Sequence, residues 1–90
     1  GERAAARVLF RALLAAGSAI ESGERDGNAL RSLMFAVLTS EPLAQPQYAE
    51  VVDARTFRPL DRAGGAIVLP IAARLGATRL LDNLSLFVDA

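Results

Sequence analysis

The first half of the chain carries apolar residues at helical spacing. Over residues 2–21 they recur every three or four positions, which predicts an amphipathic helix whose apolar stripe comprises Ala5, Val8, Leu9, Ala12, Leu13, Ala16 and Ile20. Gly23 is a suitable C-terminal stop. After a polar loop, Asp26 or Asn28 can cap a second helix that runs to about Thr39. Its apolar face comprises Leu30, Leu33, Met34, Val37 and Leu38.

The second half has the pattern of short strands. Pro42 and Pro46 end the helical region, and residues 48–53, YAEVVD, are rich in strand-forming types. Residues 66–75, AIVLPIAARL, could form a helix or a strand; the glycines on both sides favour a strand, and Pro70 then argues for an edge position or a bulge. Gly76 and Ala77 predict a tight hairpin turn. The last strand, residues 78–88, alternates, with one face formed by Leu80, Leu84, Leu86 and Val88.

This order, α-α-β-β-β, predicts one α+β domain over residues 1–90. The two helices would pack on one face of a small three-stranded antiparallel sheet. The helical pattern begins at Glu2 without a capping residue before it, which indicates that the chain is a piece of a longer protein.

The composition excludes several kinds of chemistry. The chain has no Cys, His or Lys, so it lacks thiolate nucleophiles, the commonest general base and a P-loop lysine. No pair of carboxylates stands out, and the Gly64–Gly65 pair has no Lys, Ser or Thr after it to form a phosphate loop. The groups that remain are a poor set for a complete enzyme.

The charge balance argues against nucleic acid and membranes as partners. Ten Arg offset ten acidic residues, whereas a winged-helix DNA-binding module, which two helices and a hairpin would otherwise suit, needs a basic surface. The most apolar run, residues 65–73, is broken by Pro70 and is well short of the roughly 20 residues of a membrane span. We expect a soluble, cytoplasmic protein.

Three polar residues interrupt the last strand at Arg79, Asp82 and Asn83. Strand alternation places Asp82 on the buried face with Leu80 and Leu84, where a carboxylate needs a partner; Arg74 and Arg79 are candidates. Two interpretations stay open. The four polar residues pin the hairpin register and order the domain, which we favour, or they contact a ligand directly.

Arg3, Arg7 and Arg11 form a second charged feature, a stripe along the first helix. This stripe is either a solvated face paired with acidic residues or a surface for a phosphate or an acidic neighbouring domain.

The segments YAEVVDARTFRPL and AIVLPIAARLGATRLLDNLSL resemble the carboxyl-terminal domain of bacterial pantothenate synthetases, the pantoate–β-alanine ligase family. The specific part of the match is a hairpin that ends in an AARLGxTRL[IL]DN pattern, which this chain matches at Ala72–Leu75, Gly76, Thr78–Leu81, Asp82 and Asn83. The opening ERAAARVLFRALLAA is similar to the first helix of that domain.

The resemblance implies an enzyme of coenzyme A biosynthesis that uses ATP and Mg²⁺. Pantoate would be activated as pantoyl adenylate and then attacked by β-alanine, giving pantothenate, AMP and pyrophosphate. The resemblance also implies a homodimer whose amino-terminal nucleotide-binding domain carries a His-x-Gly-His signature and a Met-Ser-Ser-Arg-Asn loop.

Both signatures are absent here, so the resemblance implies that this chain is a hinged lid that is inactive and binds no cofactor alone, with no catalytic, cofactor-binding, substrate-binding or metal-binding residue of the family. The alternative is a free-standing interaction or dimerisation module without catalytic activity.

Overall fold

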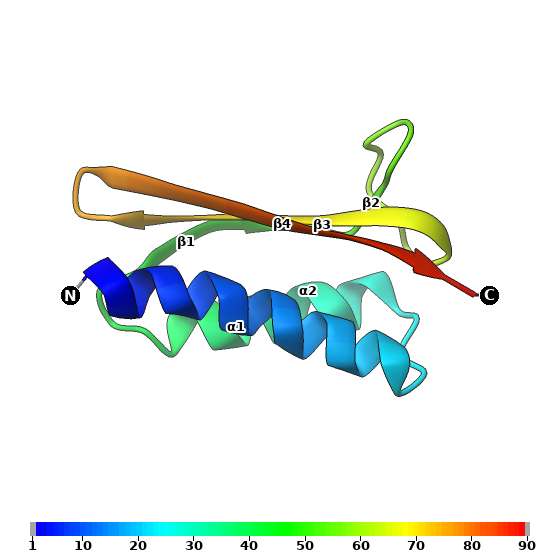
Figure 1. The fold of residues 1–90 in the computed structure, drawn as a ribbon, viewed down its shortest axis with the longest axis horizontal. Helices are drawn as coiled ribbons and strands as arrows, with labels where there is room; N and C mark the ends of the chain where they lie inside the picture. Colours follow the sequence, from blue (N-terminus) through cyan, green and yellow to red (C-terminus); the bar gives the residue numbers. More distant parts are fainter. Residues whose placement is uncertain (1, 90) are drawn as a thin grey trace.

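The computed structural model describes residues 2–89, except for the side chains of Glu2, Ala4 and Ala5, and shows two layers (Figure 1). Two antiparallel helices lie side by side against one face of an antiparallel sheet. The elements are α1 (Glu2–Glu21), α2 (Gly27–Thr39), β1 (Gln45–Ala49), β2 (Val52–Asp53), β3 (Gly65–Leu75) and β4 (Thr78–Val88). The predicted α+β class and both helices are confirmed.

Both inner helix ends are closed by local hydrogen bonds. After α1, Gly23 has a φ of 107°, and the Gly23 and Glu24 N–H groups donate to the carbonyls of Ile20 and Ala19, at 3.0 and 2.9 Å. These two bonds form a Schellman motif, which glycine favours because its backbone enters the left-handed region without steric cost. At the start of α2, Asp26 is the cap, and its Oδ1 accepts the Asn28 N–H at 3.1 Å.

The sheet has four strands rather than three, because the strand expected over residues 48–53 is two strands. β3 is central: β4 pairs along one side of it, and β1 and then β2 pair along the other. The Glu50 N–H donates to the Pro70 carbonyl at 3.0 Å, but Pro70 has no N–H to donate in return. The ladder is interrupted at this point, between Ala49 and Val52.

The edge position expected for Pro70 is therefore wrong. Pro70 lies in the middle of the central strand, opposite Asn83 of β4. A proline inside a sheet interrupts the pairing with a neighbouring strand. Here the pairing with β3 is interrupted at the junction between β1 and β2.

The β3–β4 hairpin has the predicted turn and the predicted bounds of the last strand. Leu75 pairs with Thr78, which leaves a two-residue loop of Gly76 and Ala77, and Gly76 has a φ of 58°. A positive φ at the first of two loop residues is typical of a tight hairpin turn. The register continues without a break to the pair Gly65 and Val88.

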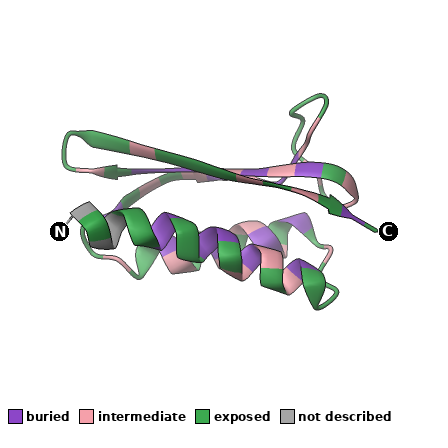
Figure 2. Ribbon diagram, viewed as in Figure 1, coloured by how far each residue is buried: buried purple, intermediate pink, exposed green. Residues whose placement is uncertain are grey.

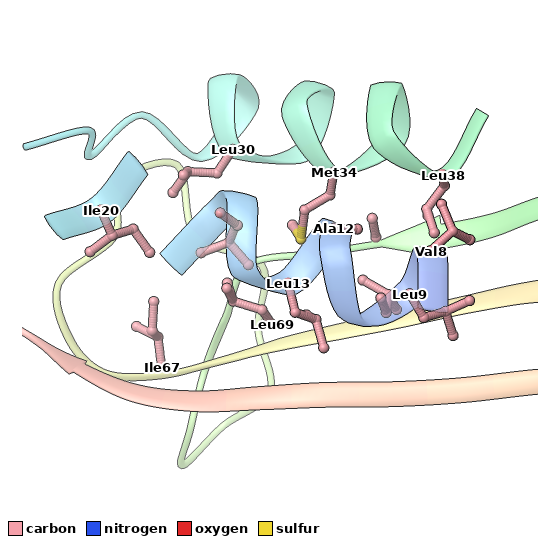
Figure 3. Close-up of a cluster of buried hydrophobic side chains, with 14 of the residues drawn as sticks. Val8, Leu9, Ala12, Leu13, Ile20, Leu30, Met34, Leu38, Ile67 and Leu69 are labelled. Atoms are coloured by element: carbon pink, nitrogen blue, oxygen red, sulfur yellow. The ribbon is translucent and has the colours of Figure 1, made fainter. Parts of the chain in front are cut away.

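Most of the core lies between the helices and β3, and β4 adds the buried Val88 and the partly buried Leu80, Leu84 and Leu86 at its margin (Figures 2 and 3). Helix α1 contributes five of the buried side chains labelled in Figure 3, α2 three and β3 two; they are Val8, Leu9, Ala12, Leu13, Ile20, Leu30, Met34, Leu38, Ile67 and Leu69. In α1 every predicted stripe residue whose side chain is described is buried, with Ala5 outside the described side chains; in α2, Leu30, Met34 and Leu38 are buried as predicted, whereas Leu33 and Val37 are half-buried. Each large side chain buried in this way contributes about 1.5–3 kcal/mol.

Candidate functional site

The helices cover only one face of the sheet, and we call the opposite side the open face. Because side chains alternate along a strand, the open face holds every second residue of the two long strands. These residues are Ala66, Val68, Pro70, Ala72, Arg74, Arg79, Leu81, Asn83, Ser85 and Phe87. Tyr48 of β1 joins them, since it pairs with Ala72. Three of the four polar residues singled out in the sequence thus share one surface.

Arg79 lies across this surface and connects β4 to β1. Its Nε donates to Gln47 Oε1 at 2.7 Å, and its guanidinium carbon is 5.9 Å from the centroid of the Tyr48 ring. This distance fits a cation–π contact. Arg74 pairs with Arg79 across the hairpin and is exposed. Two like charges opposite one another are unfavourable, and the contacts of Arg79 with β1 offset this repulsion.

Asp82 is not the buried carboxylate that strand alternation predicted. It is exposed, and its Oδ1 accepts the backbone N–H of Asn83 at 2.8 Å. The expected pairing with Arg74 or Arg79 is wrong, since the single ion pair among the described side chains joins Arg31 to Glu50. The physical reason is that β4 is an edge strand, in which only Val88 is buried.

The structure brings Arg74 and Arg79 together on the open face, with Asn83 on the same face and Asp82 on the other. Asp82 and Asn83 meet only as sequence neighbours. That these four residues order the domain stays a prediction.

A turn after β2 presents an aromatic side chain that the sequence patterns did not single out. Asp53 Oδ1 accepts the N–H groups of Arg55 and Thr56 at 2.8 and 2.9 Å. These two backbone bonds lower the pKa of the Asp53 carboxyl, because they stabilise its charged form. The turn ends at Phe57, whose φ is 58° and whose side chain is 65% exposed. In the sequence, the signal for such a turn was Asp53, three residues before Thr56, because an Asp side chain can accept hydrogen bonds from the backbone that follows it.

A half-buried network around Arg31 holds the connection between β2 and β3 against α2. Arg31 Nε donates to Glu50 Oε1 at 2.6 Å, and Nη2 donates to the Leu60 carbonyl at 2.8 Å. These partners lie 19 and 29 residues away in the sequence, so no local spacing could have indicated the network.

A groove of about 460 Å³ runs between α1 and β4. It is mostly apolar and is lined by Leu14, Gly17, Ser18, Ile20, Glu21, Leu84, Ser85, Leu86 and Phe87. Among the described residues, no three acidic side chains lie close enough together to hold a metal ion. None of the helices in the described part of the chain is long and apolar enough to cross a membrane.

Comparison with known proteins identifies relatives over almost the whole chain. The family model described as pantoate-beta-alanine ligase matches residues 1–85. The pantothenate synthetase of Roseiflexus castenholzii is 48% identical over 82 residues, and that of Chloroflexus aggregans is 49% identical over 84 residues. Each match covers 91% of this chain but 30% of the relative.

The fold agrees with this relationship. The crystal structure of pantothenate synthetase from Thermus thermophilus superposes with a TM-score of 0.81 at 28% identity, over 89% of this chain and 29% of that one. The chain thus spans less than a third of the length of the relatives that it matches. It belongs to the pantoate-β-alanine ligase family.

Proposed function

We propose that this chain is the carboxyl-terminal lid domain of a ligase that joins pantoate to β-alanine. The observation that supports the proposal is the family match over residues 1–85, in a chain that spans 30% of the relatives' length. The reaction proposed for the whole enzyme consumes ATP and passes through pantoyl adenylate, with AMP and pyrophosphate as the other products.

The lid role follows from what the residues can and cannot do. Without His, Lys or Cys, the chain lacks the commonest general base and the commonest nucleophiles, and the Arg side chains are the cations that it could offer to a phosphate. An acyl adenylate is a mixed anhydride that water hydrolyses, so a domain that closes over it protects the intermediate. We assign ATP and Mg²⁺ to the part of the enzyme outside this chain, because the resemblance places both nucleotide-binding signatures there and this chain contains neither.

A chimera tests this proposal directly. The matching third of the Roseiflexus castenholzii enzyme would be replaced by this chain, and AMP release from ATP, pantoate and β-alanine would be measured. We expect the chimera to release AMP only when both pantoate and β-alanine are present. The same enzyme truncated before the replaced third, and this chain alone, are the controls, and both should release at least about tenfold less AMP.

A covalent chimera is preferred to mixing two separate pieces, because an untethered lid loses the high effective concentration that a linker supplies. If the chimera folds with a cooperative thermal transition and yet releases no AMP, the assignment of this chain to such a ligase is wrong.

A further inference from the structure

The open face exposes large apolar side chains together with a projecting aromatic turn. Leu81 and Phe87 are 62% and 74% exposed on β4. The turn that holds Phe57 rises from the sheet on the side away from the helices (Figure 1). Tyr48 and Val68, which are half-buried, add further apolar surface to the open face. Among the described residues, three of the seven exposed large apolar side chains lie on this side of the sheet, and together with Tyr48 and Val68 they form apolar surface of a kind that is typical of an interface.

Two side chains on this side of the sheet, Phe57 and Arg79, are positioned by contacts within the chain itself. Phe57 is the single non-glycine residue with a positive φ among residues 2–89, and the two hydrogen bonds to Asp53 hold its turn. Strained backbone that carries an exposed aromatic residue is a mark of a functional position. Arg79 is held by its hydrogen bond to Gln47 and by its contact with the Tyr48 ring.

The charge of the open face indicates which kind of ligand it can lie against. The residues that β3 and β4 place there include Arg74 and Arg79 but no Asp or Glu, since Asp82 lies on the other side of the sheet. The reactants of the proposed ligase, ATP and pantoate, are anions. A positively charged and partly apolar face can close over such reactants, whereas an acidic face would repel them.

We propose that the open face is the surface that closes against the nucleotide-binding part of the ligase. The inference rests on the proposed function and adds to it the face that is used. The occupant is the part of the enzyme that this chain does not match, because the chain spans only 30% of the relatives. The outer side of the helices stays exposed to solvent in this arrangement, since it lies on the far side of the molecule from the open face (Figure 1).

Cysteine labelling of the chimera tests which face is covered. The chain has no Cys, so Leu81→Cys reports on the open face, and Phe10→Cys on α1, which is similarly exposed at 57%, is the matched control. The relative's own cysteines would first be replaced by Ser. With ATP and pantoate bound, we expect maleimide to react at least about tenfold more slowly at position 81 and about equally fast at position 10.

A charge at the same two positions gives an independent measurement. Leu81→Glu should lower AMP release by about tenfold or more, and Phe10→Glu by less than about twofold, with unchanged thermal midpoints. Equal labelling at position 81 with and without ligands would overturn the inference, as would protection at position 10 instead. Protection that depends on protein concentration would show a second copy of the chain on this face and also overturn it. A parent chimera that releases no AMP would instead refute the proposed function.

Discussion

At the scale of single residues, Gly27 is the glycine at which the fold leaves least room for a Cβ atom. It is buried at the start of α2, and its N–H donates to the Asp61 carbonyl at 2.7 Å. A Cβ atom at this position would lie 2.2 Å from the Leu60 carbonyl oxygen, which is backbone and cannot rotate away. We expect Gly27→Ala to lower the free energy of unfolding by about 1–3 kcal/mol, measured as a lower urea midpoint at unchanged slope.

Gly64→Ala is the matched control for this substitution. A Cβ at Gly64 would meet nothing within 4 Å, and its φ lies outside the left-handed region. The substitution should change stability by less than about 0.5 kcal/mol. Equal losses at the two positions would show that the contact with Leu60 is not the cause.

The sequence could predict some glycine roles but not this one. Gly23 and Gly76 follow helical or strand patterns directly, so the turns that they form are encoded by their neighbours. Gly27 is required by Leu60 and Asp61, which are more than 30 positions away. Single-sequence patterns carry no information about such a contact, and for the same reason they did not predict the partners of Arg31.

At the scale of elements, local periodicity was sufficient for the helices and the hairpin. It failed where a neighbouring strand decides the outcome. Pro70 removes one hydrogen bond from the strand beside it, which splits the expected strand over residues 48–53 into β1 and β2. Alternation placed Asp82 on the correct side of β4, but it could not show that in this edge strand only Val88 is buried.

The turn that begins at Asp53 gives the element-scale prediction. Because hydrogen bonds to Thr56 and Arg55 depress the pKa of Asp53 in the folded state, its ionised form is favoured more in the folded than in the unfolded chain. This stabilisation is present above the unfolded pKa of about 3.9 and is lost as the pH falls through the lower folded value.

Asp53→Asn keeps an acceptor oxygen but cannot ionise, so it isolates this effect. The difference in urea midpoint between the parent and Asp53→Asn should be constant from about pH 7 to pH 5 and should shrink below about pH 4. A difference that stays the same down to about pH 2 would mean that the charge of Asp53 does not stabilise the turn.

At the scale of the whole molecule, the core and the proposed interface lie on opposite faces of the sheet. The core is built mainly by α1, α2 and the inner face of β3, with Val88 of β4, while the proposed interface is built by the open face of β3 and β4 and by the turn after Asp53. The family was predictable from the residues of the last hairpin. Which face of the sheet is open could not be predicted, because it depends on which side of the sheet the helices cover.

This separation leads to a prediction for the chain by itself. With a continuous core it should unfold in one cooperative transition, and neither Mg-ATP nor pantoate should raise its thermal midpoint. A ligand stabilises a protein by RT ln(1 + [L]/Kd), and about 1 kcal/mol shifts the midpoint of a domain of this size by about 4–8 °C. A shift below about 1 °C at about 5 mM ligand would therefore place Kd above about 10 mM. A rise of several degrees with Mg-ATP would instead place a nucleotide site on this chain and contradict the assignment of nucleotide binding to the remainder of the enzyme.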